Sequence, residues 1–334
     1  MLRLPDSRGE VSRALLGALT QDPHTIAATA TPIPADPLAD EDLQLALYLC
    51  YELHYRGLPG VSDEWEWEPS LLGLRRQLEA RFEAGLLDTL GVPAGHVAAE
   101  DMDVALRAVE AADEAPSLSR YLEREGTAAE MLEFVVHRSA YQLKEADPHS
   151  WALPRLTGAP KAAMVEIQAD EYGGGAADRM HATLFAKSMD GLGLDSRYGA
   201  HLGRIPGVTL ATVNLMSLLG LHRRWRGALV GHLALFEMSS AVPNRRYGRG
   251  LRRLGWDDPE TTDFFDEHVT ADAVHESIAA VDLAGGLVRQ DPALAADVIW
   301  GARALVELEG RFARRLLEAW AQGRSSLLER LVSA

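Results

Sequence analysis

Apolar residues recur every three to four positions through most of the chain, which is the spacing of one helical face. Helices are predicted in "DEDLQLALYLCYELHYRGL" from Asp40, in "PSLLGLRRQLEARFEAGLLDTLG" from Pro69 and in "AAEDMDVALRAVEAAD". Pro69 marks a helix start, and Gly91 marks a helix stop. Strand-type alternation is nearly absent, and no period of about 20 to 50 residues repeats. The pattern predicts an all-α protein.

The helical pattern also suggests how the chain is divided. A segment rich in Ala, Thr and Pro runs up to Asp40 and is typical of an extended arm. A clear amphipathic stretch runs from Thr127 to Glu145. Further helical patterns cover 160–190, 209–239, 261–285, 292–300 and 301–332. We expect an N-terminal arm at 1–36, a helical extension at 37–115 and a helical core at 116–334.

Composition narrows the class of protein. The 334 residues are 47% hydrophobic and 25% charged, which is ordinary for a globular protein. Cys50 is the single cysteine, so neither a disulfide within one chain nor a cysteine-rich metal site is possible. The net charge of −16 argues against binding to nucleic acid or to an anionic membrane. Neither a transmembrane span nor an export signal is evident, and a cytoplasmic location is expected.

The strongest chemical signal is "FFDEHVTADAVHESIAA", where His268, Asp272 and His275 stand at i, i+4 and i+7. At about 100° per residue these positions fall within about 60° on a helix, so they share one face. Exposure to solvent is the ordinary alternative for such residues. Apolar neighbours including Phe264 and Ile278 extend the same stripe, however, and favour an inward orientation. Because unpartnered polar burial is costly, such a triplet must be paired or must bind a metal.

Several carboxylates are candidates to complete a metal site. Glu237 lies in the almost wholly apolar stretch "VGHLALFEMSSA", where it is either a ligand or the partner of an arginine. Glu145, at the end of the Thr127–Glu145 helix, is either a ligand or a solvated residue of the last turn, and only its position and spacing select it over Glu133. "MVEIQADEYGGG" contains three carboxylates in a short space, and at least one of them is expected at the surface. They are Glu166, Asp170 and Glu171.

Three consecutive glycines, Gly173–Gly175, separate Glu171 from His181. On a regular helix, these two residues would lie nearly a quarter turn apart. Glycine permits a bulge or a kink that would bring them together, and interrupted helices recur at functional sites. A competing pattern is the pair of Asp-x-x-His units that end at His181 and His275. It faintly resembles the Glu-x-x-His units of ferritin-like bundles, but the shorter aspartate makes that fold the weaker choice.

Taken together, Glu145, "EYGGGxxxRMH" from Glu171 to His181, Glu237 and "HVTADAVH" resemble the ligand series of the heme-oxygenase-like di-iron oxidases and oxygenases. This family consists of iron-containing redox enzymes. The resemblance covers residues of about 116–285 and implies a seven-helix core, two iron ions of which the second is labile, and O2 as co-substrate. The implied ligands are His181, His268 and His275 for nitrogen, and Glu145, Glu171, Glu237 and Asp272 for oxygen.

The implied reaction is the oxidation of a small amine- or carboxylate-bearing substrate with electrons from an external donor. N-oxygenation, desaturation and oxidative C–C cleavage all remain open. Tyr172 is a candidate catalytic residue because it follows Glu171, although a packed aromatic ring is an equal alternative. Arg245 and Arg246 belong to an arginine cluster that would suit a substrate carboxylate, or else form a solvated helix face.

Two other classes of protein remain open. One is a metal-free helical binding or scaffold protein in which the same residues form buried ion pairs. The other is a non-redox enzyme like thiaminase II, which would need a nucleophile, and Cys50 lies outside the expected core. The N-terminal arm and helices offer a surface for a homodimer.

Overall fold

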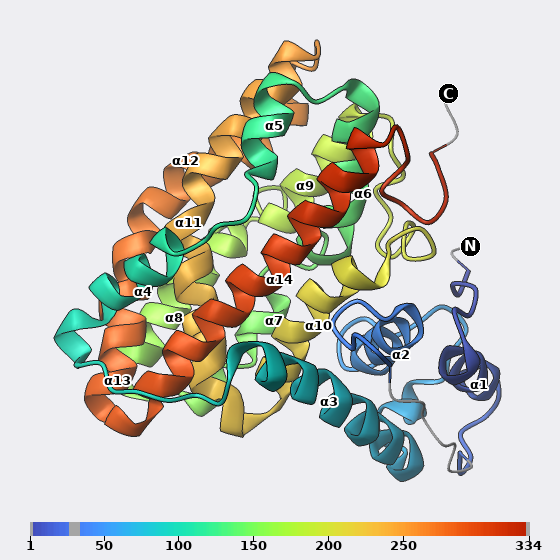
Figure 1. Cartoon of the computed structure of the whole chain (residues 1–334), viewed down its shortest axis with the longest axis horizontal. Coiled ribbons are helices and arrows are strands. Elements are labelled where there is room, and N and C mark those ends of the chain that lie inside the picture. The colour runs from blue at the N-terminus through green and yellow to red at the C-terminus, as the bar shows by residue number, and fades with distance from the viewer. Residues whose placement is uncertain (1–2, 27–33, 332–334) are drawn as a thin grey trace.

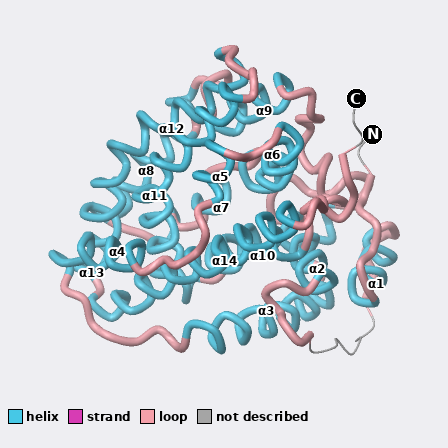
Figure 2. Tube along the Cα trace, turned by 45° about the horizontal axis from the view of Figure 1, so that its top comes forward, coloured by secondary structure: helices cyan, strands magenta, loops and turns pink. Residues whose placement is uncertain are grey.

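The computed structural model of the chain describes residues 3–26 and 34–331, except for the side chains of residues 272–274. Over these residues the chain forms helices joined by turns and loops, and no strand occurs among them (Figure 2). The predicted all-α class is therefore confirmed. Within the same residues no helix is long and apolar enough to cross a membrane.

The N-terminal helices lie at one end of the molecule (Figure 1). They are α1 (Glu10–Leu19), α2 (Glu41–Glu52) and α3 (Pro69–Leu90), with a short 3₁₀ helix at Asp63–Trp67. The side chain of Asp40 accepts a hydrogen bond from the backbone N–H of Leu43 and so caps α2. Helix α3 begins at Pro69 and ends at Gly91, as its start and stop signals predict.

The middle of the chain forms shorter helices. Helices α4 (Met102–Ala111) and α5 (Leu118–Arg124) precede α6 (Ala128–Gln142). Thr127 and Glu130 form a reciprocal capping box at the start of α6, which fixes where that helix begins. Three more helices follow, namely α7 (Asp147–Ser150), α8 (Gly158–Glu171) and α9 (His181–Gly191).

The C-terminal half contains the long helices. They are α10 (Gly207–Leu221), α11 (Arg226–Arg253), α12 (Pro259–Ser277), α13 (Gly286–Gln290) and α14 (Ala295–Ala321). The pattern at 209–239 thus divides between α10 and α11. A π-helical segment, Ile278–Gly285, continues α12. The two patterns at 292–300 and 301–332 belong largely to one continuous helix, α14.

Gly301 lies inside α14, where it packs against α11. A Cβ at Gly301 would collide with the backbone of Ala228 in α11, and a Cβ at Gly231 in α11 would collide with the backbone of Val298. These glycines allow α11 and α14 to approach closely. Gly301 is therefore a packing residue inside the helix and not a helix stop.

Helix α11 packs against both α12 and α14, and the three long helices run side by side in Figure 1. The N-terminal helices join the same hydrophobic cluster, since Leu15 and Leu47 are buried together with Leu215 and Leu305. A buried ion pair strengthens this junction, with Lys144 Nζ 2.9 Å from Oε2 of Glu52. The segment before residue 116 thus shares a core with the helices that follow it.

Candidate metal centre

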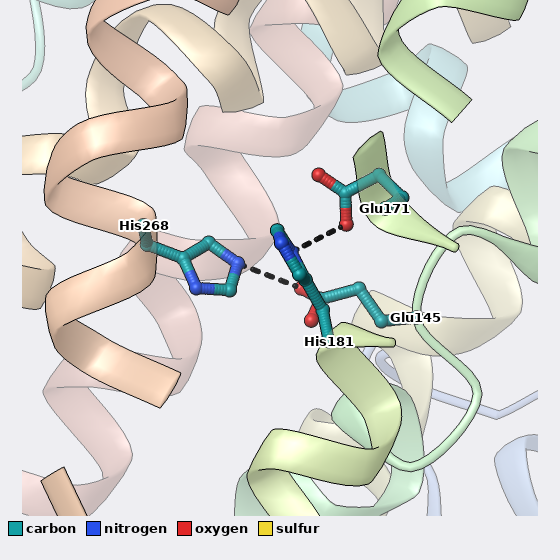
Figure 3. Close-up of side chains that lie close together, drawn as sticks. All are labelled: Glu145, Glu171, His181 and His268. Carbon is teal, nitrogen blue, oxygen red and sulfur yellow. Dashed lines mark ion pairs between the residues drawn. The ribbon is translucent and has the colours of Figure 1, made fainter. Parts of the chain in front are cut away.

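The helix that leads into the candidate site is interrupted at the three glycines. Helix α8 ends at Glu171, residues Gly173–Gly175 have φ values of 65°, 61° and 87°, and α9 begins at His181. Glu171 is therefore the last residue of one helix and His181 the first of the next. Oε2 of Glu171 lies 2.9 Å from Nδ1 of His181 (Figure 3). The expected departure from α-helical geometry is confirmed.

Four buried side chains form the first group of metal-ligating atoms, namely Glu145, Glu171, His181 and His268. One ligand atom from each lies within 4.8 Å of the others. Oε1 of Glu145 lies 3.6 Å from Nε2 of His268, and the rings of His181 and His268 are 4.5 Å apart between centroids. Figure 3 shows these side chains converging from different segments on one point.

A second buried group consists of Glu171, Glu237 and His275, with ligand atoms that also lie within 4.8 Å of one another. Oε2 of Glu237 lies 3.1 Å from Nδ1 of His275, and Oε1 of Glu171 lies 3.9 Å from the same nitrogen. Glu171 belongs to both groups and directs one oxygen toward each. This arrangement allows one carboxylate to bridge two ions.

The charges within the two groups depend on each other. Burial by itself raises the pKa of Glu171, but the imidazoles of His181, His268 and His275 outweigh that effect and lower it. Burial lowers the pKa of His275, but Glu237, Asp170 and Glu171 outweigh it and raise the pKa to about 9. Burial also lowers the pKa of His181, but Glu171 outweighs burial and raises it. The shifts therefore favour an ionised Glu171 next to positively charged groups at His181 and His275.

The residues present fit an iron pair. Oε2 of Glu145 is buried, and no residue in the described part of the chain donates a hydrogen bond to it. Such an atom needs a partner, because an unsatisfied buried acceptor is costly. Carboxylate oxygens combined with imidazole nitrogens suit iron, manganese and zinc, and the hard oxygens favour the oxidised form of iron.

Two of the histidines also contact oxygen atoms outside the donor groups, which orient their rings. Nδ1 of His268 lies 2.7 Å from the backbone carbonyl oxygen of Phe264. Nε2 of His275 lies 3.0 Å from Oδ2 of Asp170, a carboxylate that is otherwise largely exposed on α8. Such contacts fix the tautomer and the orientation of histidine ligands. The sequence pattern gave no reason to prefer Asp170 over its neighbours for this contact.

The sequence suggested Tyr172 beside the ligand Glu171, and the structure adds a second tyrosine, Tyr141, that borders the donors. The hydroxyl of Tyr172 lies 2.9 Å from both Ser150 Oγ and Asp147 Oδ1, so its role beside a ligand stays a prediction. Tyr141 is the buried tyrosine that borders the donors. Burial, followed by the carboxylates of Glu145, Glu171 and Glu237, raises its pKa well above the usual value. Its position one helical turn before Glu145 was an available signal.

A buried histidine pair beside the site was also missed. His149 Nε2 lies 3.1 Å from His232 Nδ1, and His149 borders the same small space as Glu145 and Glu237. Burial, with His232 close by, lowers the pKa of His149 well below its usual value. Burial alone lowers that of His232 to about 3. Both rings are therefore neutral at physiological pH. A histidine inside the apolar stretch "GALVGHLALF" is the signal that marks His232 as buried.

The other predicted residues are placed as follows. The side chain of Asp272 lies outside the described residues, although its backbone belongs to α12. Glu133 does not join the donors and instead accepts hydrogen bonds from Trp320 and Ser326. Arg246 borders a large cavity along α11, whereas Arg245 is exposed.

Comparison with known proteins agrees with this arrangement. The profile of the iron-containing redox enzymes matches residues 132–310, which is just over half of the chain and includes every donor named above. The chain belongs to this family of iron-containing redox enzymes, and the resemblance seen in the sequence is confirmed.

A curated relative is the nitrosourea synthase of Streptomyces achromogenes subsp. streptozoticus. The two sequences are 26% identical over 234 residues, a match that covers 67% of this chain and 49% of that protein. The chain thus spans about half the length of the curated relative that it matches.

Proposed function

We propose that the protein is a non-heme di-iron oxidase or oxygenase that uses O2 to oxidise a small substrate bearing an amine or a carboxylate. The observation that carries this proposal is the position of Glu171, which directs one oxygen toward each of two buried donor groups. One carboxylate between two sets of imidazole and carboxylate donors suits a pair of ions better than a single one.

Each donor group would hold one ion. Glu145, His181 and His268 would bind the first, Glu237 and His275 would bind the second, and Glu171 would bridge them. Asp272 would add an oxygen from α12, as the sequence suggests. Bound iron would supply electrons to O2, and an external electron donor would replace them.

The residues around the donors would control water and protons. Leu233 and Phe236 border the small space next to Glu145 and Glu237, and their apolar surfaces would exclude bulk water from it. Tyr141 would keep its phenolic proton at neutral pH, because burial and the surrounding carboxylates raise its pKa. Its hydroxyl would therefore be a proton-bearing group beside the donors.

The proposal also concerns which type of oxidation the protein catalyses. The name of the relative, nitrosourea synthase, denotes chemistry at nitrogen, so N-oxygenation stands beside desaturation and C–C cleavage among the reactions proposed for this chain. That likeness is distant and covers about half of the relative, so all three reactions belong in a product analysis.

Metal loading tests the proposal directly. The purified protein would be made metal-free, loaded with Fe(II) under anaerobic conditions, desalted and analysed for iron. We expect two ions per chain in the wild type, fewer than one in Glu171→Ala, and about one each in Glu145→Ala and Glu237→Ala. Glu166→Gln is the matched control, because Glu166 is exposed on the same helix as Glu171. Fe(II) protein exposed to O2 should consume it with a transient visible absorption.

A metal-free binding protein would give the opposite result. Iron would remain at trace level, and Glu171→Ala would then act only as the loss of a buried ion pair. Equal iron contents in Glu171→Ala and Glu237→Ala would contradict the bridging role of Glu171, even if iron binds.

A further inference from the structure

A cavity of about 500 Å³ lies along α11 and shares Phe236 with the small space at the candidate metal centre. One wall is the stretch of α11 from Leu235 to Tyr247, and others come from α6, α12 and α14. Its volume is in the range of sites that bind small molecules. None of the donor residues of the two metal-ligating groups lines it.

Phe236 connects the cavity to the metal centre. It lines the cavity and also borders the small space that contains Glu145, Glu171, Glu237 and His268. Phe264, which lines the cavity as well, contacts His268, with the two ring centroids 4.4 Å apart. A molecule in the cavity would therefore be separated from the donors by single aromatic side chains.

The walls of the cavity suit an apolar body. Aromatic rings contribute much of the surface, including Phe134, Phe185, Phe264 and Phe265. Arg138 does not add free charge to these walls, because both of its terminal nitrogens donate to Glu309, at 2.8 Å and 2.6 Å.

The charged groups on the lining favour a cation. Four carboxylates and two guanidinium groups line the cavity, and the two guanidinium groups already face acidic partners. Arg138 is paired with Glu309, and Arg246 lies 4.0 Å from Glu123 while donating to Ser119. The remaining carboxylates on the lining are Glu110, Asp113 and Glu276. Arg107 pairs with Glu276 at 2.6 Å and also lies near Glu110.

One buried acceptor on the lining has no donor among the described residues, and a second loses its usual helical donor. Oε1 of Gln142 is buried, and no residue within the described ranges donates a hydrogen bond to it. Pro243 has no N–H, so the carbonyl oxygen of Ser239, four residues earlier in α11, loses its usual helical donor. Both residues line the cavity. Unpartnered acceptors are suited to a ligand that brings N–H groups.

We infer that this cavity is the substrate chamber and that it takes a compact organic cation, an amine attached to an apolar body. The cationic nitrogen is attracted by Glu110 and Asp113 and donates to Gln142, while the apolar body contacts the phenylalanine rings. This inference rests on the proposed function for its link to oxidation, but binding itself needs no iron.

The test uses iron-free protein and a matched pair of probes, 4-phenylbutylamine and 5-phenylpentanoate. They share the phenyl group and the chain length but carry opposite charges at pH 7. Isothermal titration calorimetry should show that the amine binds at least tenfold more tightly than the carboxylate. Glu110→Gln combined with Asp113→Asn should weaken amine binding about tenfold, because exposed carboxylates contribute modestly to binding an opposite charge.

Two further variants locate the binding. Ser239→Trp places a large side chain on the cavity wall and should abolish binding of the amine, with circular dichroism confirming the fold. Asp88→Asn combined with Glu318→Gln removes the same charge from exposed positions outside the cavity and should leave the affinity unchanged. Equal or tighter binding of the carboxylate would overturn the assigned substrate class. Amine binding that survives Ser239→Trp would overturn the location.

The outcomes separate this inference from the proposed function. If the amine binds as expected but the protein takes up no iron, the di-iron proposal fails and the cavity assignment stands. If iron loads and O2 is consumed while the amine does not bind, the cavity assignment fails and the di-iron proposal stands.

Discussion

Oδ2 of Asp170 lies 3.0 Å from Nε2 of His275, although Asp170 is on the exposed side of α8 and His275 is buried in α12. The opposite ring nitrogen of His275 faces Glu237 at 3.1 Å. A carboxylate on one nitrogen of an imidazole holds its orientation and increases its basicity as a ligand. Asp170 therefore positions His275 from outside the donor groups.

Asp170→Asn should weaken the second iron site selectively. We expect the Fe(II) affinity of the ion held by Glu237 and His275 to fall by about 10- to 100-fold in an anaerobic titration, the range for loss of such a partner. The first ion should be unaffected. Glu166→Gln, on the same helix and exposed, is the control. Identical titration curves for Asp170→Asn and the wild type would show that Asp170 does not position His275.

Gly173 and Gly174 should differ in their tolerance of alanine. Both have positive φ, which costs a non-glycine residue about 1–2 kcal/mol. A Cβ at Gly174 meets nothing within 4 Å, but one at Gly173 would lie 2.7 Å from backbone atoms of Arg179 and Met180. Gly173→Ala should therefore lower the free energy of unfolding more than Gly174→Ala does, and should displace His181.

Urea unfolding and iron content measure these two effects. Gly17→Ala in α1 is the control, because Gly17 has open space around it and helical geometry. That change should stabilise the protein by up to about 1 kcal/mol. Equal losses for Gly173→Ala and Gly174→Ala would mean that the close contact with Arg179 is readily relieved.

His137 should make the protein sensitive to acid. Burial, followed by Arg138 and Arg315, lowers the pKa of His137 to about 3, and its ring nitrogens contact Thr209 and Ser326. Its folded pKa lies below the unfolded value, so its contribution is complete above about pH 6.5 and is lost as the pH falls toward 3. At pH 5 the loss amounts to roughly 2 kcal/mol.

Unfolding of wild type and His137→Asn between pH 7.5 and pH 5 checks this sign. The variant should be less stable at pH 7.5 but should lose roughly 2 kcal/mol less on acidification. His96→Asn, at an exposed position, should follow the wild type. Parallel curves for His137→Asn and wild type would show that His137 is not the group that titrates.

Lys144→Met should destabilise the junction between α2 and the end of α6. Lys144 and Glu52 are almost fully buried, and Tyr198 donates to Glu52. Removing the lysine leaves a buried carboxylate without its cation, which costs about 3–5 kcal/mol. Lys161→Met, at an exposed position of α8, is the control, and the free energy of unfolding in urea is the measurement. If Glu52→Gln added to Lys144→Met recovered nothing, the lost ion pair would not be the cause.

Local patterns in the sequence predicted much of the fold. Periodic apolar positions gave the helices, and the signals at Pro69, Thr127 and Gly91 lie where α3 and α6 begin and where α3 ends. Gly301 shows the limit of such signals. Whether a glycine ends a helix or allows a close approach depends on α11, a partner more than 60 residues away.

In the candidate site, too, features within one segment were predictable from the sequence, and contacts between helices were not. Spacing on one helix brought His268 and His275 to one side, and the glycines located the break between Glu171 and His181. The contact between Asp170 and His275 and the position of Tyr141 beside the donors depend on how separate helices pack. No periodicity within one segment contains that information.

The carboxylates proposed to attract the substrate and the metal donors come from different parts of the chain. The donors of both metal-ligating groups come from residues 145–275, whereas Glu110 and Asp113 come from α4 and the turn after it. If those carboxylates select the substrate, selectivity and reactivity are encoded in separate stretches of the sequence. Substitutions around α4 would then change which substrate is bound and leave the iron ligands intact. New substrate preferences could evolve in this way on one oxidation chemistry.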